Sequence, residues 1–339
     1  MSHQRPHAPH NSSVDRRSFL TALGGATACA ATGTALFDSR LAHAAPSPQS
    51  SAETVVKQFH ASLSEKQAAE ICFPFNHPKR FIANANWHVT EPTIGDDFYS
   101  VQQRGLINEI VKGITSEEGA ELLQMQMEDD DGGIDAYSVA MFGDAAEGDF
   151  QWELTGRHLT LRADGNSVDK TAFGGPLIYG HGEGDAASNL FYHQSKQVNE
   201  VFQALDPKQA KQALVARAPR ESAVAIQGDQ GTFPGIHVGE LSSDQQALVG
   251  TTVQKLLSPY REEDVAEVMA ILKESGDVAN LHMAFYEQED LDSDGVWDIW
   301  RIEGPSFVWH FRGAPHVHAY INISHDLKQN GKGQRRNRG

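Results

Sequence analysis

Two histidines near the end of the chain have the types and spacing best suited to chemistry. His316 and His318 flank Val317 at the start of a β-branched, aromatic segment that predicts a strand. Because successive side chains of a strand point to opposite faces, both imidazoles lie on one face, about 7 Å apart along the strand. Neutral imidazole is the commonest metal ligand, so the pair can share one ion; two ordinary surface histidines are the alternative.

A metal ion held by this pair needs a third ligand. His158, in another predicted strand, is the first candidate. His181 and Glu183 come next, because the small glycines around them would let an imidazole or carboxylate reach inward, although such a loop can equally be a flexible turn. Copper or zinc suits imidazole ligands best, and iron fits if a carboxylate joins.

Three further side chains are candidates for binding a substrate. Arg157 and Arg301 could hold an anionic group, but in an acidic protein both serve equally well as ion-pair partners. Trp309 could line an aromatic pocket together with Trp297 and Trp300.

Two acidic segments are interpreted as turns. Carboxylates at calcium-loop spacing occur at Asp290, Asp292, Asp294 and Asp298. Arg301 stands where the loop's bidentate acid belongs, so we favour a β-hairpin turn over a calcium site. The run of acids at 129–131, followed by two glycines, is interpreted as a solvated turn.

The N-terminal 44 residues have the order of a twin-arginine signal peptide. Arg16 and Arg17 precede an apolar run, and Ala42 to Ala44 offers a small-residue cleavage site. A lipid anchor at Cys29 is the variant we disfavour, because no large aliphatic residue stands in the three positions before it. We therefore expect a periplasmic or secreted protein.

Composition narrows the function classes. A formal net charge of −17 disfavours nucleic-acid binding. After residue 44 no apolar run is long enough to span a membrane, and Cys72 is the sole cysteine, so no intrachain disulfide can form. Phosphate-binding, dinucleotide-binding and serine-hydrolase motifs are absent from the sequence.

The remaining chain predicts one large α+β domain at residues 54–326, after a linker at 45–53 and before a disordered basic tail at 327–339. We expect an antiparallel sheet with helical segments packed around it, and we find no internal repeat. Apolar spacing predicts helical regions at 54–72, 99–127, 190–215 and 242–272. Strands are predicted at 136–142, 151–162, 282–286, 297–303, 307–311 and 317–323, with a bulge near Gly156.

Five segments have a familiar order and spacing: 136–143, 152–160, 175–181, 300–305 and 316–318. Through them the chain resembles the domain-of-unknown-function 3500 (DUF3500) family of exported bacterial proteins. The resemblance implies a single domain and places the Gly-x-His and His-x-His segments in one context. It implies no activity.

Together these features predict an exported metal-binding protein. A metal-dependent oxidase or hydrolase would act on a small-molecule or polymeric substrate outside the cytoplasm. A non-catalytic periplasmic metal-handling or ligand-binding protein is the alternative.

Overall fold

The computed structural model of the protein describes residues 45–289 and 294–327. The helices in this part are α3 (Ser51–Ala61), α4 (Glu65–Ile71), α5 (Val101–Gly113), α6 (Glu117–Asp131), α7 (His193–Gln203), α8 (Pro207–Ala213), α9 (Ser243–Leu256) and α10 (Glu262–Glu274). The strands are β1 (Cys72–Phe73), β2 (Ser138–Gly143), β3 (Phe150–Gly156), β4 (Leu159–Ala163), β5 (Leu177–His181), β6 (Leu214–Val215), β7 (Ile236–His237), β8 (His282–Tyr286), β9 (Ile299–Gly304), β10 (Phe307–Arg312) and β11 (Val317–Ile323). None of the described helices is both long and apolar enough to cross a membrane.

Each predicted helical region contains two helices. The region at 54–72 is divided because Ser64 begins α4 with a capping box, its side chain accepting from the amide of Gln67. The predicted strand at 151–162 is also divided. Gly156 pairs with Leu159 across a two-residue turn, so the expected bulge is a β-hairpin.

The α+β class is confirmed, but the expectation of an antiparallel sheet is wrong, because the single eleven-stranded sheet is mixed. Its order is β1-β2-β3-β4-β5-β11-β10-β9-β8-β6, with β7 paired to β8. The β1–β2 and β6–β8 pairs are parallel, and the other pairs are antiparallel. Both β1 and β6 have only two residues and directly follow a short helix, so no alternation could predict them.

The order of elements repeats, which corrects the expectation of no internal repeat. The first half (residues 51–181) and the second half (residues 193–323) both begin with helices of 11 and 7 residues and a strand of 2. Each then has an irregular segment, two longer helices and four antiparallel strands. In each half two capping-box glutamines 36 residues apart bond to each other, Gln67 to Gln103 and Gln209 to Gln245.

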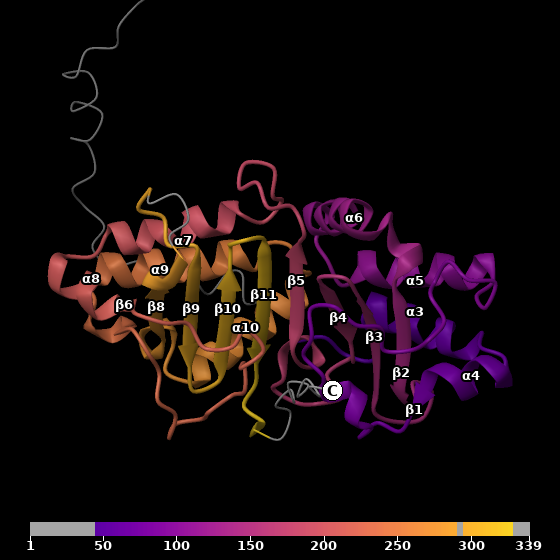
Figure 1. Cartoon of the computed structure of the whole chain (residues 1–339). Coiled ribbons are helices and arrows are strands. Elements are labelled where there is room, and N and C mark those ends of the chain that lie inside the picture. Colours follow the sequence, from indigo (N-terminus) through magenta and orange to yellow (C-terminus); the bar gives the residue numbers. More distant parts are fainter. Residues whose placement is uncertain (1–44, 290–293, 328–339) are drawn as a thin grey trace, which may run out of the picture. The chain divides into compact units, whose positions relative to one another are not determined.

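The two halves join through one strand pair. The first five strands of the sheet order come from the first half and the last five from the second, so β5 and β11 meet in the middle (Figure 1). They pair antiparallel, with Val317 opposite His181 and His318 opposite Gly180. Any site at the ends of β5 and β11 is therefore built from both halves.

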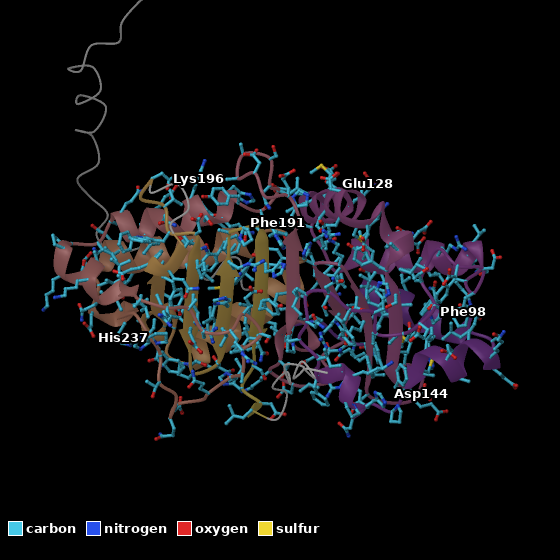
Figure 2. All side chains as sticks on the ribbon, viewed as in Figure 1. Phe98, Glu128, Asp144, Phe191, Lys196 and His237 are labelled. Atoms are coloured by element: carbon cyan, nitrogen blue, oxygen red, sulfur yellow. The ribbon has the colours of Figure 1, made fainter. Side chains whose placement is uncertain are left out.

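The two faces of the sheet differ in chemistry. One face carries aromatic and aliphatic residues such as Trp152 and Trp309, which belong to the main apolar core shared with the helices. Phe191, labelled in Figure 2, extends this core, with its ring centroid 4.8 Å from that of Tyr179. The other face carries buried charged residues, including Arg162 and Arg301.

Two long irregular segments cover the charged face. Segment 74–93 lies over the first half, where Arg162 donates to the carbonyl oxygens of Arg80 and Ile82. Segment 216–235 lies over the second half, where Arg301 donates to the carbonyl oxygen of Ala223. Buried arginines thus satisfy backbone acceptors that have no strand partner.

Candidate metal centre

Three histidine rings meet where the two halves join. His316 directly precedes β11, His318 lies within it, and His158 lies in the turn between β3 and β4. One ring nitrogen of each lies no more than 4.8 Å from the others. Within the described residues this is the one group of three or more histidines, cysteines, aspartates or glutamates close enough to hold a metal ion. The structure therefore brings together the three histidines that the sequence placed first.

Local backbone geometry explains how His158 reaches the pair. His158 has a φ of 56°, in the left-handed region that a histidine seldom adopts, and its amide donates to the carbonyl of Ala85 at 2.6 Å. The neighbouring residue on β5 is Gly180, where a β-carbon would lie 3.3 Å from the β-carbon of His158 and 2.3 Å from the carbonyl oxygen of Val317. Glycine at this position leaves the room that the His158 side chain occupies.

A carboxylate stands behind two of the three rings. The Nδ1–H of His158 donates to Asp130 at 2.8 Å, and the Nδ1–H of His318 donates to Glu221 at 2.7 Å. Each bond fixes the tautomer and turns the Nε2 lone pair away from the carboxylate. His316 and His318 are in direct contact through their Nε2 atoms, 2.9 Å apart.

The two carboxylates are held in their ionised form. Burial raises the pKa of Asp130, but hydrogen bonds from His158, Gln126 and the amide of Gly182 outweigh it and hold the pKa below the usual range. Burial likewise acts against ionised Glu221, and the hydrogen bond from His318 together with the charge of Arg312 lowers its pKa below the usual value.

The imidazoles of His316 and His318 are held neutral. Burial, followed by the nearby His318, lowers the pKa of His316 to about 4. Burial also lowers the pKa of His318, although its hydrogen bond to Glu221 opposes the shift. At pH 7 both rings are therefore in the neutral form that coordinates metals.

The donor set fits a transition metal. Three imidazoles, two of them with a carboxylate hydrogen-bonded to the far ring nitrogen, match the ligand chemistry of zinc and copper sites. Two nitrogens bound at about 2.0–2.1 Å from one tetrahedral ion lie about 3.3–3.4 Å apart. The three ring nitrogens here lie within 4.8 Å of one another, so the side chains must close by at most about 1.5 Å around an ion.

The other two predicted ligands lie outside this cluster. His181 is opposite Val317 in the β5–β11 register, so its ring points to the other face of the sheet from His318. There its Nε2 lies 3.3 Å from Asp129, and its Nδ1 accepts from the amide of Leu190. Glu183 is exposed and accepts from the amide of Asp185.

The three predicted substrate-binding residues lie in different surroundings. Arg157 is exposed beside the centre, with Nε 3.9 Å from Asp130. Arg301 is buried in the second half, where it forms an ion pair with Glu303 at 2.7 Å. Trp309 is fully buried in the main core, and its indole nitrogen donates to the Tyr179 hydroxyl.

The acidic loop before β9 lies partly outside the described residues, which exclude Asp290 and Asp292. Of the other two carboxylates, Asp294 accepts from the amide of Val296, and Asp298 is buried and accepts from the Tyr192 hydroxyl. The strands on either side of the loop, β8 and β9, pair antiparallel, as the hairpin interpretation requires.

Sequence reasoning missed both carboxylates behind the histidines. The acids at 129–131 form the last turn of α6 rather than a solvated turn, and the Asp130 side chain is 3% exposed. Glu221 lies in the irregular segment 216–235, where no periodic pattern marks it. The one usable signal for Asp130 was its place near the end of an amphipathic helical region, which the two following glycines obscured.

Comparison with known proteins identifies the family. No curated protein and no solved structure gives a significant match to the chain. A family model described as "Protein of unknown function (DUF3500)" matches residues 46–325, which include the three histidines and both carboxylates. The chain therefore belongs to the DUF3500 family.

Proposed function

We propose that this protein binds one transition-metal ion, zinc or copper, through His158, His316 and His318. The observation that carries the proposal is the convergence of three imidazoles with a carboxylate bonded to the far nitrogen of two of them. Ordinary surface histidines need neither a convergence of three rings nor a carboxylate on the far nitrogen. The left-handed backbone of His158 adds support, because strained residues cluster at functional sites.

The number of ligands favours catalysis over a structural role. Structural zinc sites are closed by four protein ligands, whereas catalytic sites keep a position open. Among the described residues no fourth histidine, cysteine or carboxylate joins the three histidines. His316 and His318 are only half-buried, so a substrate can approach from their side.

The residues around the centre have separable roles. Asp130 and Glu221 hold the protons of His158 and His318 on Nδ1 and orient the rings. Arg157, exposed beside Asp130, is placed to attract an anionic group of a small or polymeric substrate. Bound zinc would supply Lewis acidity for hydrolysis, and bound copper or iron would supply electron transfer for oxidation.

Metal titration of the purified full-length protein tests the proposal. After dialysis against a chelator, calorimetry with Zn²⁺ and Cu²⁺ is expected to show one equivalent bound, and elemental analysis to confirm it. The double variant His316→Ala/His318→Ala is expected to lose at least about 100-fold in affinity.

The matched control is His193→Ala, which removes an exposed imidazole on α7. It should leave stoichiometry and affinity unchanged. Absence of stoichiometric metal in the unaltered protein, or equal affinity in the double variant, would refute the proposal.

A non-catalytic metal-handling protein is the second candidate, because the same half-buried pair could release an ion to a partner. Spectroscopy of the Co²⁺- or Cu²⁺-loaded protein separates the two. An exchangeable water on the ion favours catalysis, whereas a closed coordination shell favours storage or delivery.

We also propose that the protein is exported through the twin-arginine route. The support is the sequence alone, since residues 1–44 lie outside the described part. Replacing Arg16 and Arg17 by lysine should retain the protein in the cytoplasm. Continued export of the folded Arg16→Lys/Arg17→Lys variant would argue against this route.

A further inference from the structure

The two irregular segments that cover the charged face of the sheet have equivalent positions but different side chains. Segment 74–93 follows β1, and segment 216–235 follows β6. Arg80 follows Phe73, the last residue of β1, by the same number of residues as Ser222 follows Val215, the last residue of β6. A long cationic side chain in the first half thus corresponds to a small hydroxyl in the second.

In the first half, Arg80 fills the space between its segment and the sheet. It is 2% exposed, its guanidinium lies over the rings of Phe75 and Phe81, and its Nη1 donates to Gln151 at 3.1 Å. Arg162 and Glu153, which pair across β3 and β4, are two of the charged residues that act on Arg80. The planar cation is therefore seated beside a carboxylate.

In the first half, an oxygen of Glu153 and the hydroxyl of Thr160 are buried without a hydrogen bond. In the second half, the corresponding place has three such atoms on neighbouring strands. Arg301 and His310 pair across β9 and β10, as Glu153 and Arg162 do across β3 and β4. Nη1 of Arg301, Nδ1 of His310 and the hydroxyl of Tyr286 are all buried and make no hydrogen bond. These three residues are 4%, 1% and 0% exposed.

Such a concentration of unpaired atoms needs an explanation. Buried polar groups in folded proteins nearly always have a partner, because an unpaired one loses its hydration without compensation. These three lie on adjacent strands of one face, with the rings of Tyr286 and His310 6.4 Å apart. Ser222 is too short to take the role of Arg80.

The chemistry of the atoms selects the ligand. A guanidinium nitrogen can only donate, and the Tyr286 hydroxyl keeps its proton because burial raises its pKa to about 12. The complementary group therefore presents acceptor oxygens. Arg301 stands where the first half has Glu153. The first half therefore places a carboxylate beside the planar cation of Arg80, whereas the second half places a guanidinium there, which favours a planar anion.

We propose that Tyr286, Arg301 and His310 form a second ligand site, beneath segment 216–235, that binds the carboxylate of a small organic acid. Arg301 is already paired with Glu303 through two nitrogens, so the site has little net charge to balance a doubly charged phosphate. The site adjoins the surface, because Ser222 is partly exposed and Ala223 exposed.

Thermal unfolding in acetate tests this site independently of the metal centre. The His316→Ala/His318→Ala full-length chain is melted at pH 7 in increasing sodium acetate, with sodium chloride at the same ionic strength as reference. A ligand that binds only the folded state raises the melting temperature. We expect a saturable rise in acetate, none in chloride, and little in phosphate.

Variants at Ser222 sharpen the test. Ser222→Arg introduces the cation that the first half has at this position and should abolish the acetate response. Ser222→Ala adds no charge or bulk and should retain it. Tyr286→Phe, which preserves the ring, should weaken acetate binding by at least about tenfold even if the arginine variant folds poorly.

Three outcomes would overturn the proposal. They are no saturable acetate response, an unchanged response in both Ser222→Arg and Tyr286→Phe, or an equal response to phosphate. Because the test chain lacks two metal ligands, failure of the metal proposal would leave these results untouched.

Discussion

Each half of the sheet has a hairpin at the equivalent position, and the two hairpin turns present different side chains. In the first half the turn between β3 and β4 presents His158, which bonds to Asp130 near the end of α6 at 2.8 Å. In the second half the turn between β9 and β10 presents Ser306, whose hydroxyl lies 2.6 Å from that of Ser275, directly after α10. Both contacts tie a hairpin turn to the end of the second long helix.

The difference shows which part of the arrangement is architecture and which is chemistry. A side-chain hydrogen bond at this place is needed by both halves to close the hairpin against the helix. Only the first half makes this bond with a histidine and a carboxylate. Only the turn residue of the first half, His158, faces the rings of His316 and His318. Four predictions follow the same contrast between the halves.

The largest effect is expected from removing the central buried arginine of the first half. Arg162 is fully buried, pairs with Glu153 at 2.9 Å and donates to three backbone carbonyls. Arg162→Met should cost about 3–5 kcal/mol of unfolding free energy in denaturant titrations, because the buried Glu153 loses the arginine that is paired with it. Arg301→Met, the matched change in the second half, should cost less because Arg301 leaves one nitrogen unpaired already. Equal losses would mean that the halves do not differ in this respect.

The second prediction concerns the carboxylate that only the first half places behind its turn. Asp130→Asn should weaken metal binding by about 10–100-fold, since partners of a ligating histidine raise its basicity and fix its orientation. Asp129→Asn is the control, because Asp129 faces His181 on the other side of the sheet. Calorimetric titration compares them. A comparable loss in the Asp129 variant would place His181 in the site.

The third prediction uses His310, which stands where the first half has Arg162. Burial lowers the pKa of His310 to about 3, so the unfolded chain binds the proton more tightly than the folded one. Its contribution to stability is complete above pH 6.5 and falls as the pH decreases, by about 2 kcal/mol at pH 5. His310→Gln should lose this dependence. The measurement is the difference in unfolding free energy between variant and unaltered chain at pH 7 and 5; a constant difference would contradict it.

The smallest effect belongs to the second half's own turn. Ser306→Ala removes the contact to Ser275 and should cost about 1 kcal/mol of unfolding free energy, with no change in metal affinity. By contrast, His158→Asn keeps a residue that tolerates the left-handed backbone and should abolish high-affinity binding with little loss of stability. Weakened metal binding in the serine variant would show that the centre depends on both turns.

Much of the secondary structure could be predicted from the sequence, because local periodicity encodes it. All four helical regions and the strands of the second half follow apolar spacing closely, and the His-x-His alternation placed two rings on one face. The two-residue strands β1 and β6 could not be predicted, because their pairing depends on a distant strand rather than on their own residues.

The candidate site divides in the same way. His158, His316 and His318 were selected by residue type and strand spacing. Asp130 and Glu221 were not, because their partners lie 28 and 97 residues away along the chain. His181 illustrates the limit from the other side, since a one-residue step along a strand reverses the face, and only the β5–β11 register decides which face it takes.

The sequence by itself determined the kind of chemistry available: imidazoles at strand spacing, a strongly negative net charge and a single cysteine after residue 44. Tertiary structure alone decided that one junction between two similar halves gathers three rings and two carboxylates. The physical reason is that periodicity acts within a few residues, whereas the register of β5 against β11 and the approach of segment 216–235 depend on how the whole sheet assembles.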